Sequence, residues 1–285
     1  MIYARRMDTD VHAEISAGER FAFGENWRDF LALIDEDRIV AAVASLKNML
    51  GVDRLEGLSF IDMGSGSGLF SLAARRLGAN VTSFDYDDSS VGCTAELRRR
   101  YFPEDESWRV LQGSVLDAPF LSELGRFEIV YSWGVLHHTG DMWSALENAA
   151  RMVAPGGRLF ISIYNDQGLA SRAWTSIKRT YNRSGPTEKQ ALIAGVGAYF
   201  MARRITATAI RRRPGRDASR PVITGRERGR GMDRQRDLVD WVGGWPFEVA
   251  KPEEIFDFYH YRGFELERLK TCGGGLGCNE FVFRT

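Results

Sequence analysis

The chain has 285 residues, of which 44% are hydrophobic and 27% are charged, a composition typical of soluble globular proteins. Basic and acidic residues number 38 each, so the overall charge indicates no polyanionic partner. Three cysteines are too few for a disulfide framework, and no apolar stretch approaches the roughly 20 residues that a membrane span needs. Residues 1–16 lack the apolar core of a signal peptide, which predicts a cytoplasmic protein and leaves a peripheral membrane association open.

The first segment with a clear pattern is helical. Between Phe30 and Leu50, apolar side chains recur at about every third or fourth position, and Gly51 follows as a stop. We expect one or two helices within residues 13–50, and we assign residues 1–55 to an N-terminal helical cap.

A regular alternation of strands and helices begins at residue 58. The segments expected to be strands are 58–64, 79–85, 108–115, 127–134 and 157–165. The expected helices cover 68–78, 95–102 and 142–154, and the APGG sequence at 154–157 is expected to be a turn. Strands that alternate with helices of this length predict a doubly wound parallel sheet with helices on both faces, which forms a core of residues 56–165.

The alternation stops at Asp166, and residues 166–250 are interpreted as a helical insertion, or lid, after the fifth strand. This insertion is rich in arginine: twelve arginines stand against three acidic residues between Arg203 and Arg236. The arginines favour a phosphorylated acceptor, an anionic membrane surface or nucleic acid, unless the segment is a solvated loop. Trp241, near its far end, indicates an ordered and packed segment.

Residues 251–285 are expected to complete the core with a helix at 252–263 and two strands at 264–271 and 278–285. Because only CGGGLG separates these strands, they form a hairpin and the last strand is antiparallel. The expected fold is therefore α/β, with a doubly wound, mostly parallel seven-stranded sheet, an N-terminal helical extension and a helical insertion.

The sequence FIDMGSGSGLF indicates a ligand site, because a strand runs into a glycine-rich turn and a helix follows. The pattern is GxGxG, with Leu69 where the dinucleotide fingerprint GxGxxG requires glycine. Asp62 precedes the turn and suits a ligand with an ammonium group, and Asp85, 21 residues after Gly64, is placed to bind a ribose diol. This combination predicts a nucleoside with an amino-acid tail, the alternative being a tight turn without a ligand.

At these residues the chain resembles the class I S-adenosylmethionine-dependent methyltransferases. FIDMGSGSG is similar to their first motif, VTSFDYD to their second-strand motif, and QGSV to the segment that flanks the adenine. FEIVYSWGVLHHTGD and LENAARMVAPGGRLFISIY are similar to their fourth- and fifth-strand motifs, and VLHHTGD resembles the branch that modifies quinones and sugars. The resemblance covers about 58–165 and 252–285, and it implies S-adenosylmethionine as the cofactor.

The resemblance also implies which residues bind this cofactor. The methionine moiety is assigned to Asp62, Gly64, Ser65, Gly66 and Gly68, the ribose to Asp85, the adenine to Tyr86, Ser114 and Val115, and the sulfonium methyl to Trp133. Ser114 departs from the aspartate often found at its position, which puts a direct adenine contact there in doubt.

The acceptor is expected at the carboxyl ends of strands four and five. His137 and His138 follow strand four and are candidate general bases, the alternative being that both pack within the loop. The other residues expected to contact the acceptor are Trp27 in the N-terminal cap, Tyr164 and Asn165 after strand five, and Asn279 and Glu280 in the final hairpin. Two cysteines on that hairpin do not make a zinc site, so no metal is expected.

The favoured function is methylation of an oxygen on a small molecule, such as a sugar or a lipid-linked acceptor, by direct displacement. The alternatives are N- or C-methylation of a natural product, and methylation of nucleic acid through the arginine-rich insertion. The sequence lacks the NPPY-type tetrapeptide of amino-group methylation on bases, which weighs against nucleic acid. A nicotinamide-dependent oxidoreductase and a non-catalytic cofactor-binding protein are less favoured. The identity of the acceptor and the oligomeric state are left open.

Overall fold

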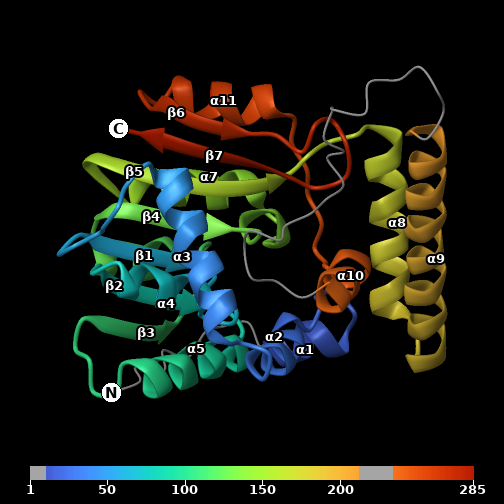
Figure 1. Cartoon of the computed structure of the whole chain (residues 1–285), viewed down its shortest axis with the longest axis horizontal. Helices are drawn as coiled ribbons and strands as arrows, with labels where there is room; N and C mark the ends of the chain where they lie inside the picture. Colours follow the sequence, from blue (N-terminus) through green and yellow to red (C-terminus); the bar gives the residue numbers. More distant parts are fainter. Residues whose placement is uncertain (1–10, 212–233) are drawn as a thin grey trace.

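A seven-stranded sheet in the order β3-β2-β1-β4-β5-β7-β6 forms the centre of the protein in our computed structural model, which describes residues 11–211 and 234–285 (Figure 1). The strands are β1 (Ser59–Met63), β2 (Asn80–Asp85), β3 (Trp108–Gln112), β4 (Phe127–Trp133), β5 (Val153–Tyr164), β6 (Glu265–Lys270) and β7 (Cys278–Arg284). Strands β1 to β5 are parallel to one another, and β7 is antiparallel to both β5 and β6. The predicted α/β fold with an antiparallel last strand is confirmed.

The predicted turn at 154–157 is wrong, because these residues form the irregular start of β5. The pairing of β4 with β5 shifts register between Phe127 and Ile129, so extra residues of β5 bulge there. A β-carbon on Gly157 would lie 2.8 Å from a carbonyl oxygen of the bulge, so the close backbone approach requires glycine. The proline and glycines that suggested a turn instead shape a bulged strand.

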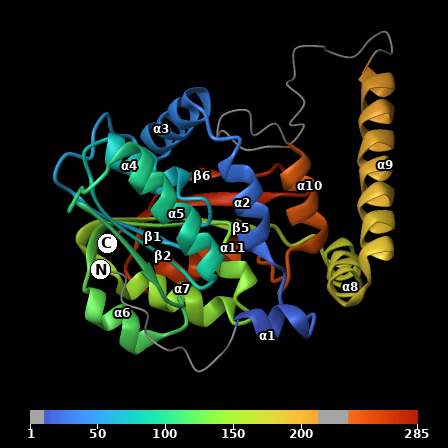
Figure 2. The same cartoon turned by 90° about the horizontal axis from the view of Figure 1, so that it is seen from below.

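Helices cover both faces of the sheet (Figure 2). One face packs against α3 (Glu36–Leu50), α4 (Leu69–Arg76) and α5 (Asp88–Tyr101), and the other against α6 (Ala118–Leu124), α7 (Met142–Arg151) and α11 (Pro252–His260). Each face has its own hydrophobic core, as expected for a doubly wound sheet whose central strands are buried on both sides. The short helix α6 had no clear signal in the sequence.

From residue 11 onward, three helices precede β1, so the expectation of one or two is wrong. They are α1 (Val11–Ser16), α2 (Phe23–Leu31) and α3. Asp35 divides α2 from α3, because its carboxylate accepts a hydrogen bond from the Arg38 amide and caps the third helix. Gly51 ends α3 in the left-handed conformation, as its position in the sequence predicts.

The segment between β5 and α11 contains α8 (Leu169–Arg183), α9 (Pro186–Arg211) and α10 (Arg234–Gly243). Helices α8 and α9 pair side by side beyond the end of the sheet, and α10 lies between them and the sheet (Figure 1). A third hydrophobic core joins these helices to the N-terminal segment through Phe21, Trp174, Tyr181, Val196 and Val242. Trp241 packs against this core, in agreement with the ordered far end expected from the sequence. Much of the arginine-rich run, residues 212–233, lies outside the described residues.

In the described part of the chain, no helix combines the length and the apolar character that crossing a membrane requires.

Candidate functional site

The glycine loop between β1 and α4 lies at the carboxyl edge of the sheet. Its central residue, Gly66, has a φ of +54°, and a β-carbon there would lie 2.9 Å from the indole nitrogen of Trp27. The Gly66 amide donates a 2.9 Å hydrogen bond to the carboxylate of Asp85 at the end of β2. The loop therefore brings together the ends of β1 and β2 and the helix α2, and only glycine fits at its centre.

The remaining loop residues begin the helix α4. The Gly68 amide donates to the Ser65 carbonyl, and the Ser65 hydroxyl pairs with the Thr94 hydroxyl at 2.9 Å. Gly68 is the residue before α4 and adopts a left-handed conformation, with a φ of +80°. The first amides of α4 consequently follow directly on the loop, an arrangement suited to polar or anionic ligand groups.

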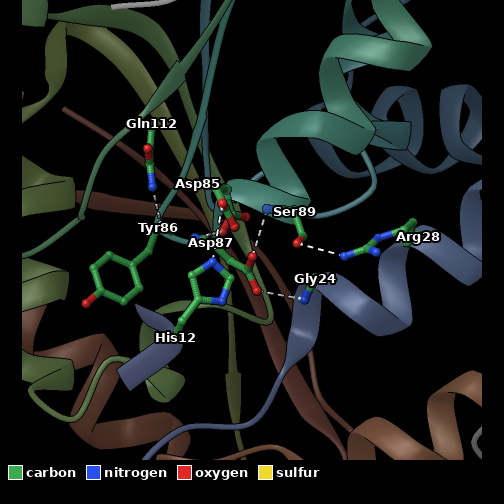
Figure 3. Close-up of polar contacts among 9 residues, drawn as sticks. His12, Gly24, Arg28, Asp85, Tyr86, Asp87, Ser89 and Gln112 are labelled. Atoms are coloured by element: carbon green, nitrogen blue, oxygen red, sulfur yellow. Dashed lines mark hydrogen bonds and ion pairs between the residues drawn. The ribbon is translucent and has the colours of Figure 1, made fainter. Parts of the chain in front are cut away.

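Asp85 presents an acceptor at the edge of this loop (Figure 3). Its carboxylate accepts hydrogen bonds from the amides of Gly66 and Asp87. Burial raises the pKa of Asp85 to about 6, although these amide bonds oppose the rise. The group is therefore mostly ionised at neutral pH and able to accept hydrogen bonds from a diol.

Asp62 lies beneath the loop rather than at its surface. Its side chain is 2% exposed and accepts a 2.6 Å hydrogen bond from the Ser71 hydroxyl. Ser71 in turn accepts from the Ser83 hydroxyl, and Ser83 accepts from the indole nitrogen of Trp108. Burial raises the pKa of Asp62 to about 7. The buried chain links β1, α4, β2 and β3, so Asp62 supports the loop, and its contact with a methionine moiety stays a prediction.

The residues predicted near the adenine lie next to the N-terminal segment. The Tyr86 hydroxyl donates to Glu14 at 3.0 Å, and the guanidinium of Arg20 lies 4.8 Å from the centre of the Tyr86 ring. Val115 is buried in the core, whereas the hydroxyl of the half-buried Ser114 accepts from a neighbouring backbone amide. Sequence reasoning did not find Glu14 or Arg20, because nothing local indicates that they reach β2.

The N-terminal segment and the insertion contact each other above the glycine loop. The Gly24 amide at the start of α2 donates to the Asp87 carboxylate (Figure 3), and the Asn26 side chain donates to Asp240 of α10 at 2.7 Å. The Arg20 guanidinium donates to the His138 carbonyl at 3.2 Å. Residues 11–31 and α10 thus form one continuous cover over the carboxyl edge of the sheet. This cover is called the cap from here on, and it differs from the N-terminal helical cap of residues 1–55 that was predicted from the sequence.

His137 and His138 lie in a short 3-10 turn, η1 (Leu136–His138), directly after β4. The His137 ring is fully buried, and neither of its nitrogens has a hydrogen-bond partner among the described residues. The Nδ1 atom of His138 is 2.6 Å from the Pro246 carbonyl, so it must carry the proton that it donates. This tautomer leaves Nε2 as an acceptor.

Both histidines are neutral at physiological pH. Burial, and next the neighbouring His138, hold the pKa of His137 well below its usual value. Burial, and next the positive charge of Lys178, lower the pKa of His138 to about 3. Neither ring gains a proton readily, and a group with so low a pKa is a weak base.

The ends of β4, β5 and β7 place a row of side chains on one face of the sheet. Trp133 pairs with Ser162, and Ser162 pairs with Glu280. The Ser162 hydroxyl and one Glu280 carboxylate oxygen are buried without hydrogen-bond partners among the described residues, and the other oxygen accepts from Lys270 at 2.6 Å. Buried polar atoms without a hydrogen-bond partner are rare in proteins and indicate a place where water or a ligand binds.

The predicted residues Asn165 and Asn279 pair with each other, because the Asn279 amide donates to the Asn165 side-chain oxygen at 3.0 Å. Asn165 and Gln167 also donate to the carbonyl of Gly275 in the final hairpin. The glycine-rich hairpin is therefore approached closely by the segment after β5. This pairing positions Tyr164, the last residue of β5, whose ring is 4.1 Å from that of His137.

Lys178 of α8 is a buried polar residue that sequence reasoning missed. Its side chain is fully buried, and its ammonium donates a hydrogen bond to the Trp241 carbonyl. The Nζ atom lies 4.7 Å from the ring centre of Phe247, 5.2 Å from that of Trp241 and 5.7 Å from that of Tyr164. The only signal in the sequence is its spacing from Trp174 and Tyr181, which places Lys178 on the apolar face of α8.

A family of known proteins matches this chain. The sequence profile of the family described as "Methyltransferase domain" matches residues 31–205. The ubiquinone biosynthesis O-methyltransferase of Rhizobium etli is 33% identical over 113 residues, which are 39% of this chain and 43% of that protein. The protein of the same name from a Methylobacterium species is 30% identical over 120 residues, which are 42% of this chain and 46% of that protein. The matched segment thus spans less than half the length of these curated relatives.

Several solved structures are similar in fold. The 1,6-didemethyltoxoflavin-N1-methyltransferase of Burkholderia thailandensis has a TM-score of 0.49 and 17% identity, over 100% of this chain and 94% of that chain. An S-adenosylmethionine-dependent methyltransferase of Mesorhizobium loti has a TM-score of 0.49 and 15% identity, over 86% of this chain and 98% of that chain.

Proposed function

Because the chain belongs to the class I S-adenosylmethionine-dependent methyltransferases, we propose that it transfers the methyl group of S-adenosylmethionine to a hydroxyl group on an aromatic small molecule. The strongest support for the cofactor site is the glycine loop, whose centre has no room for a side chain beneath Trp27. Asp85 at its edge carries the acceptor oxygens that a ribose diol needs. S-adenosylmethionine supplies a methyl group that is already activated by the positive sulfonium.

We assign the cofactor to the carboxyl edge of β1, β2 and β4. In this assignment, the loop Gly64–Gly68 holds the methionine moiety, Asp85 the ribose, and Tyr86, Ser114 and Val115 line the adenine. Trp27 and Trp133 lie on the two sides of the transferred methyl group. The cap excludes water from this space, which favours displacement at the sulfonium over hydrolysis.

The acceptor is assigned to the adjacent ends of β4, β5 and β7. The unpartnered oxygens of Ser162 and Glu280 support this location, because a polar group of the acceptor other than the reacting hydroxyl would satisfy both. Asn165 and Asn279 fix the backbone around them. The rings of Tyr164, Trp241 and Phe247 offer flat apolar surfaces, and Tyr164 lies 5.2 Å and 5.3 Å from the other two. Such surfaces favour an aromatic acceptor over a sugar.

The two histidines are proposed to act on the acceptor side. His138 is the better placed of the two, because the Pro246 carbonyl fixes its tautomer and leaves Nε2 to accept a hydrogen bond. With a pKa of about 3, His138 orients a second polar group of the acceptor, through Nε2, rather than taking the proton of the reacting hydroxyl. His137 packs between His138 and Tyr164 and holds both rings in place.

The proposed function is tested with S-adenosylmethionine that carries a labelled methyl group. The full chain is incubated separately with 3,4-dihydroxybenzoate and related phenols, with sugar nucleotides, with aromatic amines, and with RNA and DNA. We expect label in the phenols only. Label in nucleic acid would support the arginine-rich insertion as a nucleic-acid site, and label in amines or sugars alone would contradict an aromatic hydroxyl acceptor.

A further inference from the structure

Lys178 is a fully buried lysine at the carboxyl edge of the sheet, on the helix α8 that belongs to the insertion after β5. We infer that Lys178 is the group that removes the proton from the acceptor hydroxyl during methyl transfer. This inference rests on the proposed function, because it requires a hydroxyl acceptor next to the methyl donor. It assigns a role in the reaction to a residue that neither the glycine loop nor the histidine turn contains.

The burial of Lys178 is unusual because, among the described residues, no carboxylate forms an ion pair with it. Buried lysines are normally paired with an acidic residue, since an isolated charge in an apolar environment is costly. Among residues 11–211 and 234–285, the polar contact of the Lys178 ammonium is the Trp241 carbonyl, and no carboxylate pairs with it. Asp240 acts on it only at longer range. A neutral amine, or an ammonium that faces a bound anion, is the arrangement that this environment favours.

The surrounding rings hold the Nζ atom in one place. Phe247, Trp241 and Tyr164 lie around it at 4.7 to 5.7 Å, and the Trp241 carbonyl accepts one hydrogen bond. Burial among these three rings favours the neutral amine, because a charge is costly in an apolar environment. The aromatic faces also attract a cation, which stabilises the ammonium that proton transfer would create. An amine that must change its charge during a reaction needs this kind of balance.

The position of Lys178 is next to the proposed acceptor site. The Tyr164 ring is near both Lys178 and His137: its centre lies 5.7 Å from the Lys178 Nζ atom and 4.1 Å from the centre of the His137 ring. Tyr164 also pairs with Cys278 at the start of β7, two residues from Glu280. Lys178 therefore approaches the ends of β5 and β7 from the insertion, whereas the cofactor is assigned to β1, β2 and β4.

The electrostatic surroundings agree with a role as a base. Burial lowers the pKa of Lys178 to about 7, and the neighbouring Asp240 and Cys278 side chains oppose this only in part. The other titratable groups that face it are Tyr164 and the two neutral histidines. A base is most effective when its pKa lies near the working pH, and Lys178 meets this condition whereas His138 does not.

The step balances as follows for a phenolic acceptor. The O–H bond breaks and its proton moves to the lone pair of the neutral Lys178 amine. The oxygen forms a bond to the methyl carbon while the carbon–sulfur bond breaks, and the electron pair of that bond stays on sulfur. The Lys178 ammonium then releases its proton to water after the product leaves. A phenol, with a pKa of about 10, is within reach of such an amine, whereas an aliphatic hydroxyl is far less acidic.

The inference is tested first by substitution in the full chain, with 3,4-dihydroxybenzoate as the probe. Lys178→Met keeps the length of the side chain but removes the amine, and Lys178→Arg keeps a charge that cannot be lost. We expect both to lower kcat at least 100-fold, with the Kd for S-adenosylhomocysteine within twofold of the unaltered protein. Lys189→Met, at a lysine that lies over the Tyr181 ring on α9, is the matched control and keeps full activity. Full kcat in Lys178→Met would overturn the inference.

Two further measurements separate a base from a packing residue. Methylamine added to Lys178→Ala is expected to restore activity in proportion to the concentration of neutral amine, whereas a packing defect would not respond. In the unaltered protein, the lysine ε-carbon signals of a ¹³C-labelled sample are expected to include one that titrates near pH 7, absent from Lys178→Met.

The NMR titration needs no acceptor, so its outcome is independent of the proposed function. A Lys178 signal that stays protonated up to pH 10 would overturn the inference even if the protein methylates phenols. Conversely, a protein that binds no S-adenosylmethionine would refute the proposed function, while the titration would still report whether Lys178 is a poised amine. Failure of the two ideas is therefore distinguishable.

Discussion

The side-chain amide of Asn26 donates a 2.7 Å hydrogen bond to the carboxylate of Asp240, across 214 positions of the sequence. This bond joins α2 of the N-terminal segment to α10 of the insertion. Trp27, the next residue of α2, lies over Gly66 in the glycine loop. Helix α2, which precedes the sheet in the sequence, and helix α10, which follows β5, are therefore joined directly above the proposed position of the methyl group.

Asn26→Ala is expected to loosen the cap. Loss of one hydrogen bond to a charged group lowers the free energy of unfolding by about 1.5–3 kcal/mol. We expect S-adenosylhomocysteine to dissociate several-fold faster, because α2 no longer holds α10 over the loop. Stopped-flow tryptophan fluorescence measures this rate. Glu25→Ala, at an exposed neighbour on the same helix, is the control. An unchanged dissociation rate would show that the cap does not retain the ligand.

Asp85→Asn is expected to weaken S-adenosylmethionine binding by about 10- to 100-fold, since it replaces a charged acceptor of two hydrogen bonds. The pKa of Asp85 is raised to about 6, so protonation removes the same acceptor as the pH falls through this value. Calorimetric Kd values should therefore rise below about pH 6 in the unaltered protein and change less in the variant. Asp88→Asn, at an exposed neighbour, should bind normally. If the Kd depends on pH equally in both proteins, the group that titrates is not Asp85.

His138 has two nitrogens with separate roles, which two substitutions can distinguish. In His138→Asn, the side-chain amide can replace Nδ1 as the donor to Pro246, whereas His138→Ala removes both nitrogens. We expect kcat to fall at least tenfold in both variants, with cofactor affinity nearly unchanged, and thermal stability to fall mainly in the alanine variant. His137→Ala is expected to lower kcat by a similar factor. If His138→Asn and His137→Ala both keep full turnover, the histidines serve packing alone.

Lys178 gives the stability of the protein a characteristic pH dependence. Its pKa is about 7 in the folded state and near 10.4 in an unfolded chain, so between these values the unfolded chain binds more protons. The free energy of unfolding should therefore rise with pH from about 7 to 10, and this contribution amounts to a few kcal/mol at about 1.4 kcal/mol per pKa unit. Urea unfolding at several pH values tests this. Lys178→Met should flatten the rise, and Lys189→Met should not.

The sequence predicted the features that depend on local pattern. The strand that leads into GSGSG, the helix that follows and Asp85 at the next strand end are all encoded within about 25 residues, because a βα unit is a local structure. The antiparallel β7 followed from the six residues of CGGGLG, which leave space only for a hairpin. The ordered end of the insertion followed from its tryptophans, which must be buried somewhere.

The features that the sequence did not predict depend on contacts between distant segments. Lys178 is an ordinary lysine in sequence, and only the placement of Trp241 and Phe247 around it makes it unusual. Asp62 has the spacing of a ligand-binding residue, yet Ser71 on the following helix draws it into a buried chain. The APGG segment has the composition of a turn, but Val153 and Arg158 on either side of it pair with β4 and keep it in the sheet as a bulge.

The most direct test of the account is the position of the transferred methyl group. The full chain is incubated with 3,4-dihydroxybenzoate and S-adenosylmethionine whose methyl carbon is ¹³C, and the products are identified by NMR and mass spectrometry. We predict one ¹³C-methoxy group on the ring and one S-adenosylhomocysteine formed for each product molecule. Formation of S-adenosylhomocysteine with the ¹³C on a nitrogen, a ring carbon or nucleic acid, or no transfer to any phenol although the cofactor binds, would contradict an aromatic hydroxyl acceptor.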